Sequence, residues 1–414
     1  MDEDGHGTHV AGIIGAAGNN GVGVAGINWN TSLMALKFIG QGGGDIEGVM
    51  ECVDYILSEK ARGVPIRVVN ASYGGPEYSE FEKEAYEALE DAGILLIASA
   101  GNSSSDLGES SNYPACYNLP NIISVAATTK DDELAYFSNY GQQVHLAAPG
   151  SRILSTYLDD HYELMSGTSM AAPQVTGAVA LIYAFMSTAD ALEAKERVLR
   201  GADELESLKG MVLTNGRLNV YNSLVVELSG PFIFSISPTS ASPGDEVTVT
   251  GVRFGPSQDE GRILFSGVEA EIVAWTDKEI RCLVPELEAA QVELVVMVEE
   301  LASNPVTFYL DLYHRYYLPL APMEPPWVCY LILTNLNDEA VNVRVMVCES
   351  GAYVYNSFEE YLPAFGSVYK KLTEYGLHSP QNLVWVETTR QVLVSALVAN
   401  LDMTNFVYVK AMEH

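Results

Sequence analysis

The sequence predicts an α/β domain with a parallel sheet and helices on both faces, followed by two β-sandwich domains. Over residues 1–228, apolar runs typical of strands alternate with helical patterns. After Ser229-Gly230-Pro231 the pattern changes to short alternating strands separated by turn signals, and a further break falls near residues 312–313. A chain of 414 residues is long enough for two or three domains. We therefore expect domains at residues 1–228, 231–311 and 313–414.

Strands and helices are expected to alternate through the first domain. Residues 45–60 have apolar side chains at helical spacing, and residues 94–98 form the unbroken apolar run that a buried strand needs. Because a parallel sheet is covered on both faces, its strands lack the polar alternation of half-exposed strands. In chain order we expect a strand at 32–38, a helix at 45–60, a strand at 66–70, a helix at 81–92, and strands at 94–98 and 122–126.

The composition narrows the class of partner. There are 54 acidic and 22 basic residues, so the formal net charge is −32, and a field of that sign repels nucleic acid and anionic membrane surfaces. No apolar run is long enough to cross a bilayer. The five cysteines are odd in number and scattered, which argues against a dense disulfide framework or a zinc cluster. Cys329 and Cys348 form either a disulfide between neighbouring strands or two buried thiols.

Two motifs supply the halves of a proton-transfer pair. Ser169 lies in Gly-Thr-Ser-Met-Ala-Ala-Pro and His6 lies in His-Gly-Thr-His-Val-Ala-Gly, each at the start of a helical run. A serine hydroxyl is a weak nucleophile unless a base within hydrogen-bonding reach takes its proton. Each residue alone has an ordinary interpretation, because a serine before a helix is commonly an N-cap and a buried histidine is commonly structural.

A third motif adds an amide. Asn102 ends the motif Ala-Ser-Ala-Gly-Asn, which closes the strand expected at 94–98. In an open α/β sheet, ligands bind outside the carboxyl ends of the strands, where an asparagine amide can donate to a developing oxyanion. An asparagine in a turn after a strand is also common. The three motifs together make catalysis the more specific interpretation.

With these motifs in this order, residues 1–228 resemble the subtilisin-like serine proteases, the subtilase family. The resemblance implies a subtilisin-like fold, with Ser169 as nucleophile, His6 as general base, and Asn102 in the oxyanion hole beside the Ser169 N–H. It also implies a secreted, extracellular endopeptidase that binds a protein or peptide substrate as an extended strand and requires no cofactor. The substrate-binding edges that it implies are Ser72, Tyr73 and Gly74 on one side and Gly42, Gly43 and Gly44 on the other.

The family's catalytic aspartate has no counterpart in the sequence. The family carries it on a strand tens of residues before the histidine, whereas the acidic residues upstream of His6 are Asp2, Glu3 and Asp4. We expect all three to be solvated loop residues. The simplest interpretation is an N-terminally truncated sequence with weak or no activity, since losing the aspartate of a subtilisin lowers turnover by about four orders of magnitude. The alternative is a non-enzymatic pseudoprotease scaffold that presents its β-sandwich domains for binding.

The segment from Gly18 to Val24 resembles a calcium loop of many subtilases. Asn20 and the carbonyl groups of Val22 and Val24 would supply oxygen ligands suited to a hard cation. The resemblance therefore leaves room for a structural calcium, and a glycine-rich turn without metal is the alternative.

The two downstream segments have β patterns of different kinds. Residues 231–311 resemble an immunoglobulin-like domain of the IPT/TIG class, with proline turns at Pro238 and Pro243 and a Gly-x-x-Phe-Gly hairpin that ends at Gly255. Residues 313–414 resemble extracellular β-sandwich accessory modules. Such domains bind partners or act as spacers, which leaves open an extracellular partner.

Overall fold

The protein is described by a computed structural model that divides into two compact units. The first unit comprises Met1–Thr239, Glu246–Leu283 and Glu293–Phe308, and the second comprises Ser240–Asp245, Val284–Val292 and Tyr309–His414. The residues that the structure describes are 2–40, 43–259, 261–287, 289–310, 314–319, 327–337, 340–349, 353–372, 383–388, 392–400, 406–410 and 412–413.

A six-stranded sheet forms the centre of the first unit, in the order β1-β2-β3-β4-β8-β7. The pairs β1–β2, β2–β3, β3–β4 and β4–β8 are parallel, and β7 pairs with β8 antiparallel. The largely parallel sheet predicted from the sequence is therefore confirmed. The strands are β1 (Val68–Ala71), β2 (Leu95–Ser99), β3 (Ile122–Thr128), β4 (Leu146–Pro149), β7 (Asp203–Glu204) and β8 (Gly216–Arg217).

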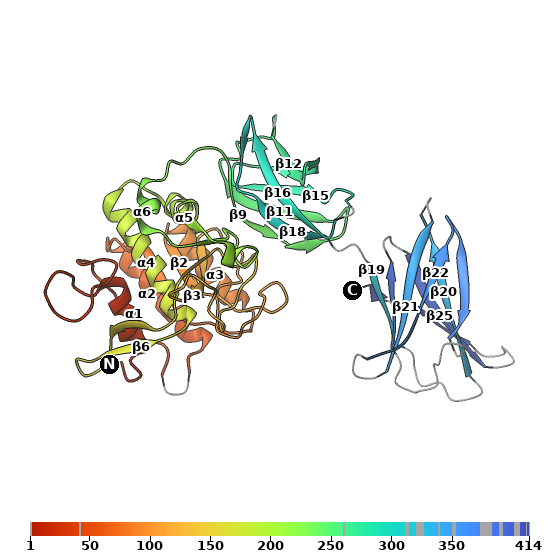
Figure 1. Ribbon diagram of the computed structural model, residues 1–414, viewed down its shortest axis with the longest axis horizontal. Coiled ribbons are helices and arrows are strands. Elements are labelled where there is room, and N and C mark those ends of the chain that lie inside the picture. Colours follow the sequence, from red (N-terminus) through yellow and green to blue (C-terminus); the bar gives the residue numbers. More distant parts are fainter. Residues whose placement is uncertain are drawn as a thin grey trace. The chain divides into compact units, whose positions relative to one another are not determined.

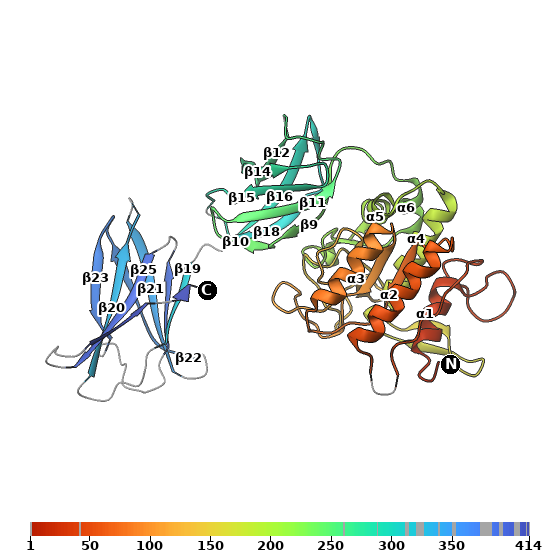
Figure 2. The same ribbon diagram turned by 180° about the vertical axis from the view of Figure 1, so that it is seen from behind.

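Helices cover both faces of this sheet. Successive side chains of a strand point to opposite faces, so Leu95 and Ile97 pack in one core cluster with α4 while Leu96 and Ala98 pack in another with α2 and α3. Figure 1 shows α4 and α5 in front of the sheet. Figure 2 views the molecule from the opposite side and shows α2 and α3 in front of the sheet. The helices are α1 (His6–Gly15), α2 (Ile46–Ala61), α3 (Glu80–Asp91), α4 (Thr168–Phe185), α5 (Ala191–Arg200) and α6 (Val220–Val225), with a 3₁₀ turn at Glu206–Leu208.

Polar side chains determine where several helices begin. Asp45, Ser79 and Asp190 precede α2, α3 and α5, and each accepts a hydrogen bond from a backbone N–H in the first turn. Such caps satisfy N–H groups that have no partner within the helix and contribute about 1 kcal/mol each. Glycines, Gly5 and Gly167, precede α1 and α4 instead. These two helices begin with the predicted catalytic motifs.

The strand expected at residues 32–38 is wrong. The structure assigns no strand there, and the Phe38 ring packs edge-to-face on Tyr73 with 4.9 Å between centroids. Leu33 and Met34 are 47% and 42% exposed. A strand exists only when a neighbour satisfies its N–H and C=O groups, and no strand in the described part of the chain pairs with this segment. The apolar pattern is present, but a local pattern does not show whether a partner strand pairs with it.

Two further sheets follow the α/β domain. Their inward-facing side chains, such as Val247, Val249, Ile263 and Phe265, are fully buried, as expected for a β-sandwich. One sheet has the order β14-β15-β11-β9, and the other the order β10-β18-β16-β12-β13 with β17 beside β16. The strands are β9 (Phe232–Ser237), β10 (Ser240–Ala241), β11 (Glu246–Val252), β12 (Arg262–Phe265), β13 (Val268–Glu269), β14 (Glu271–Trp275), β15 (Glu279–Leu283), β16 (Gln291–Val298), β17 (Leu301–Ala302) and β18 (Val306–Leu310).

A second sandwich occupies the C-terminal part of the chain. One core cluster joins Leu331 and Val394 of one sheet to Val345 and Val386 of the other. The sheets have the orders β22-β21-β24-β19-β27 and β23-β20-β25-β26. Their strands are β19 (His314–Pro319), β20 (Trp327–Asn335), β21 (Val341–Glu349), β22 (Tyr353–Leu362), β23 (Ser367–Lys371), β24 (Leu383–Thr388), β25 (Val392–Asn400), β26 (Phe406–Lys410) and β27 (Met412–Glu413).

The structure corrects one expectation for the cysteines. Cys329 lies in β20 and Cys348 in β21, which belong to different sheets, so they do not lie on neighbouring strands of one sheet. The structure does not describe the side chains of Cys329 and Cys348. A disulfide between these two cysteines therefore stays a prediction. The expected boundaries at 1–228, 231–311 and 313–414 also stay predictions. No helix in the described ranges is long and apolar enough to cross a membrane.

Candidate active site

Ser169 is the second residue of α4. The first N–H groups of a helix have no partner within it, so this end of α4 offers donors to an anion. The Ser169 side chain is half-buried, and its Oγ donates to the Ser72 carbonyl oxygen at 3.3 Å. In return, the Ser72 hydroxyl donates to the Ser169 carbonyl oxygen at 2.8 Å. The fold therefore brings the expected nucleophile to the expected substrate-binding edge.

Asn102 is held beside Ser169 by Thr168, the residue that precedes the serine in its motif. Its Oδ1 accepts from the Thr168 backbone N–H at 2.9 Å and from the Thr168 hydroxyl at 3.1 Å. A Cβ built on Gly167 would lie 3.4 Å from Asn102 Nδ2 and 3.6 Å from the Ser169 backbone nitrogen. Both donors therefore border one small space, which stays open because residue 167 has no side chain. That arrangement suits an oxygen that gains negative charge.

His6 opens α1, which contacts the start of α4. Val10, Ile13 and Ile14 of α1 form one apolar cluster with Met170. Burial lowers the pKa of His6, and the neighbouring Asp4 carboxylate offsets part of this effect. A neutral imidazole is what a general base requires. Among the contacts of the described residues there is no hydrogen bond between His6 and Ser169, so the proton-transfer pair itself stays a prediction.

A hairpin of β5 (Ile153–Thr156) and β6 (Tyr162–Met165) holds α1 in place. The fully buried His9 points its Nε2 at the carbonyl oxygens of Ile153 and Glu163, at 3.0 Å from each. Because a carbonyl oxygen only accepts, Nε2 carries the proton. The Ser155 hydroxyl donates to the His9 carbonyl oxygen at 2.8 Å. His9 is therefore a structural link between the hairpin and the helix that begins at His6.

Asp2 differs from the solvated loop residue that the sequence predicts. Its carboxylate accepts from the Gly5 N–H at 3.0 Å, the Thr8 N–H at 2.8 Å and the Thr8 hydroxyl at 2.7 Å. Burial alone would raise the pKa of Asp2, but these hydrogen bonds lower it to about 2. The prediction failed because the motif Asp-x-x-Gly looks like a loop, whereas the fold makes it the cap of α1. Glu3 and Asp4 are exposed, as expected.

The Tyr73 side chain is held by two aromatic neighbours. Its ring packs on Phe38, and its hydroxyl lies 2.9 Å from that of Tyr86 in α3. Burial raises the pKa of both tyrosines. Tyr86 donates to Glu82 Oε1 at 2.8 Å, so its hydroxyl must accept from Tyr73. Contacts with Phe38 and with Tyr86 of α3 thus anchor the expected substrate-binding edge.

Glu82 is not among the residues that the sequence predicts for the site, although a local signal is present. Ser79 and Glu82 have the spacing of a capping box, in which the glutamate returns to the backbone N–H of the serine. Here the Tyr117 hydroxyl takes that N–H at 3.1 Å. The carboxylate of Glu82, which is only 7% exposed, accepts from Tyr117 at 2.8 Å and from Tyr86. The Tyr117 hydroxyl therefore lies between the Ser79 N–H and the Glu82 carboxylate, which would contact each other directly in a capping box.

The facing edge is described in part. Gly43 pairs with Gly40 in an isolated bridge and has a φ of +92°, and Gly42 lies outside the described residues. A Cβ on Gly44 would lie 2.8 Å from a ring atom of Phe38. Since Phe38 also contacts Tyr73, this ring joins the two expected edges. The hollow beside it is lined by Lys37, Phe38, Asp45, Glu47, Gly48, Glu51 and Cys52.

The expected calcium loop is closed by its own hydrogen bond. Asn20 Oδ1 accepts from the Val22 N–H at 3.0 Å. Calcium takes six to eight oxygen ligands, and the described residues contain no group of three or more His, Cys, Asp or Glu side chains placed to hold a metal. The role of Asn20, Val22 and Val24 as calcium ligands stays a prediction.

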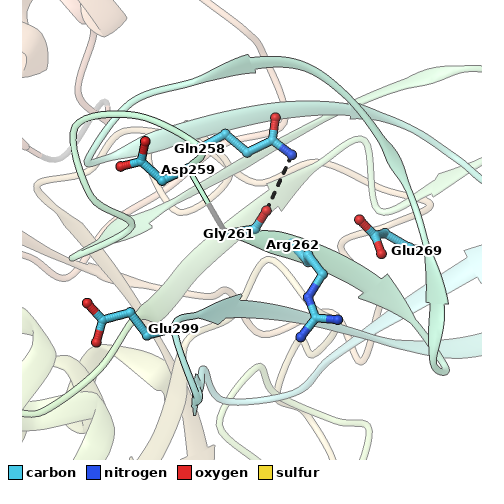
Figure 3. A pocket seen from close by; sticks show the side chains of 6 residues that line it. All are labelled: Gln258, Asp259, Gly261, Arg262, Glu269 and Glu299. Atoms are coloured by element: carbon cyan, nitrogen blue, oxygen red, sulfur yellow. Dashed lines mark hydrogen bonds between the residues drawn. The ribbon is translucent and has the colours of Figure 1, made fainter.

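A polar hollow lies in the first β-sandwich, apart from the serine motifs. Figure 3 shows it lined by Gln258, Asp259, Gly261, Arg262, Glu269 and Glu299. The Gln258 amide donates to the Gly261 carbonyl oxygen at 3.3 Å. The six described residues that line it do not include a nucleophile paired with a base, so they do not form a second candidate for the catalytic site.

Known proteins resemble this chain over the same regions. Residues 1–219 match the subtilase family, and residues 231–310 match the IPT/TIG domain. The subtilisin-like protease 2 of Plasmodium falciparum (isolate 3D7) is 35% identical over 239 residues, which cover 55% of this chain and 17% of that protein. The minor extracellular protease Epr of Bacillus subtilis (strain 168) is 38% identical over 182 residues, covering 44% of this chain and 27% of Epr.

A third relative also matches only part of the chain. The major intracellular serine protease of Bacillus subtilis (strain 168) is 38% identical over 188 residues, covering 44% of this chain and 56% of that protein. The chain thus spans only part of the length of these relatives. The resemblances to subtilases and to IPT/TIG domains are confirmed. Because the subtilase match over residues 1–219 covers more than half of the chain, the protein belongs to the subtilase family.

Proposed function

We propose that this protein is a serine endopeptidase that hydrolyses peptide bonds through an acyl-enzyme on Ser169. The observation that carries the proposal is the space beside Gly167, which is bordered by Asn102 Nδ2 and the Ser169 backbone nitrogen. Donors in such a position stabilise the oxyanion of acyl transfer. The substrate is a protein or peptide that lies along the Ser72–Gly74 segment.

In this mechanism each group has a defined role. Ser169 Oγ attacks the scissile carbonyl while His6 accepts its proton, and the oxyanion accepts from Asn102 Nδ2 and the Ser169 N–H. His6 then donates the proton to the leaving amine. Water hydrolyses the acyl-enzyme with His6 again as base. The chemistry needs no organic cofactor.

We expect weak activity from the chain as given. A neutral histidine is an efficient base when a carboxylate orients its ring. In the part of the chain that the structure describes, Asp2 caps α1, and no carboxylate is hydrogen-bonded to His6. The second candidate function, a pseudoprotease scaffold with binding β-sandwiches, rests on this same observation.

A fluorophosphonate probe, which reacts with activated serine hydroxyls, separates the two functions. We expect slow labelling at Ser169 in the folded chain, at least about tenfold faster than in the heat-denatured chain, because residual catalysis survives loss of one triad member. Mass spectrometry of the intact chain and its peptides measures the rate and the site. Ser169→Ala should abolish labelling, and Ser103→Ala, at an exposed serine beside Asn102, should not. Equal labelling of folded and denatured chain would favour the scaffold.

Secretion is part of the proposal. One relative is named as an extracellular protease, which supports an extracellular location, and IPT/TIG-type sandwiches commonly bind partners outside the active site. Recovery of the chain's native protein from the culture medium of its source cells would support this location. Recovery only from the cell interior would contradict it.

A further inference from the structure

Ser169 has a backbone carbonyl group that α4 cannot satisfy. In an α-helix the C=O of one residue accepts from the N–H four residues later. Four residues after Ser169 stands Pro173, inside α4, and proline has no N–H. The motif that contains the nucleophile therefore leaves the nucleophile's own carbonyl oxygen without its helical donor.

The Ser72 hydroxyl supplies that donor. It donates to the Ser169 carbonyl oxygen at 2.8 Å, across 97 residues of sequence. Ser72 directly follows β1, at the carboxyl end of the sheet. The bond that proline removes from the helix is thus replaced by one from the expected peptide-binding edge. As a result, the first turn of α4 is tied sideways to the segment along which the substrate would lie.

A second pair of contacts agrees with this direction of the hydroxyl. Thr176 Oγ1 donates to Asn70 Oδ1 at 2.8 Å, and Asn70 Nδ2 donates to Ser72 Oγ at 2.9 Å. A serine hydroxyl has one proton, so an oxygen that accepts from Asn70 directs its proton to Ser169. Ser169 and Thr176 are seven residues, or two turns, apart on α4. The chain of bonds therefore leaves the helix and returns to it two turns away.

We propose that the Ser72 hydroxyl is a positioning group for the nucleophile: it replaces the hydrogen bond that Pro173 withholds and fixes Ser169 against the peptide-binding edge. This inference rests on the proposed function in taking Ser169 as the nucleophile. Its physical basis is the cost of leaving a half-buried carbonyl group without a partner, which would let the first turn of α4 shift. A small shift there would misplace both the Ser169 Oγ and the Ser169 N–H.

The test is a rescue experiment in the full chain. Ser72→Ala should slow fluorophosphonate labelling about threefold to tenfold, the effect of one hydrogen bond. Pro173→Ala restores an N–H that can donate to the Ser169 carbonyl oxygen. The double variant should therefore label within about twofold of Pro173→Ala alone. Ser99→Ala is the matched control, since the Ser99 hydroxyl donates to the Tyr73 carbonyl oxygen on the same segment at 3.3 Å; it should change the rate less than twofold.

Hydrogen exchange gives a readout that needs no reactivity. Peptides covering the first turn of α4 should exchange faster in Ser72→Ala, and the double variant should restore slow exchange. If exchange and labelling in Ser72→Ala match those in Ser99→Ala, or if Pro173→Ala gives no rescue, the positioning role is wrong. A wild-type chain that shows the expected exchange pattern but no labelling would contradict the proposed function while leaving the hydrogen bond supported.

Discussion

Asp2 is the side chain in which local sequence and observed role differ most. Three donors from Gly5 and Thr8 converge on its carboxylate within 3.0 Å. The carboxylate accepts these hydrogen bonds and so does for α1 what a capping serine or aspartate does for other helices. Because α1 begins with His6, the position of the proposed general base depends on this carboxylate as well as on the hairpin that holds His9.

The Asp2 carboxylate makes the stability of α1 depend on pH. Its pKa is lowered from 3.8 to about 2, so it stabilises the folded chain above pH 4 and loses that effect as the pH falls towards 2. We expect Asp2→Asn to reduce the free energy of unfolding by about 1 kcal/mol at pH 7, after allowance for solvent screening. Denaturation curves at several pH values measure this difference. Glu3→Gln, at an exposed position, is the control. A difference that stays constant from pH 7 to pH 2 would contradict the role.

At the scale of elements, α3 is more than a cover for the sheet. Its Glu82 takes hydrogen bonds from Tyr86 and Tyr117 and is almost fully buried. Buried carboxylates are tolerated only where hydrogen bonds replace their hydration. Through Tyr86 the helix reaches Tyr73, so a surface helix supports the segment that we propose for substrate binding.

Glu82→Gln should destabilise the chain although it preserves size. A glutamine has one acceptor oxygen, and its NH₂ group would face a tyrosine hydroxyl that now donates to the carboxylate. We expect the free energy of unfolding to fall by about 2 kcal/mol, measured by chemical denaturation. Glu84→Gln, on the exposed side of the same helix, should change it by less than about 0.5 kcal/mol. Equal effects of the two changes would show that the tyrosine contacts contribute nothing.

Helices and buried strands were predictable because their signals are local. The helices expected at 45–60 and 81–92 occur at Ile46–Ala61 and Glu80–Asp91. The strand at 32–38 was not predictable in the same way, since strand formation depends on a distant partner. Glu82 was missed for a related reason: its spacing to Ser79 was visible, but the tyrosine that enters between them comes from another loop.

At the scale of the whole molecule, the α/β domain and the first β-sandwich share a core. Phe232 and Phe234 belong to the same apolar cluster as α4 and α5. Glu196 of α5, only 1% exposed, accepts from Arg200 at 2.6 Å and from Arg253 of the sandwich at 2.6 Å. Within the first compact unit, therefore, the IPT/TIG strands are packed against the protease domain.

Arg253→Met should loosen this junction. The two hydrogen bonds from Arg253 to the buried Glu196 carboxylate disappear while the one from Arg200 remains, so we expect a loss of about 2 kcal/mol and faster cleavage by added trypsin near residues 226–231. Calorimetry should then separate one cooperative transition into two. Arg281→Met is the control, because Arg281 pairs with Glu246 at 3.0 Å with both side chains 43% exposed. If the two variants behave alike in calorimetry and cleavage, Arg253 does not couple the domains.

The sequence by itself determined the family, the order of the motifs and the alternation of strands and helices, because these depend on residue type and on spacing along the chain. Only the tertiary structure decided what lies beside Ser169. The Asn102 amide is oriented by Thr168, 66 residues away, and the Ser169 carbonyl oxygen is satisfied by Ser72, 97 residues away. Pro173 indicates from the sequence alone that the Ser169 carbonyl oxygen lacks its helical hydrogen bond. Which side chain replaces that bond depends on how β1 and α4 pack. Hydrogen bonds between distant residues follow from that packing, and no local pattern encodes them.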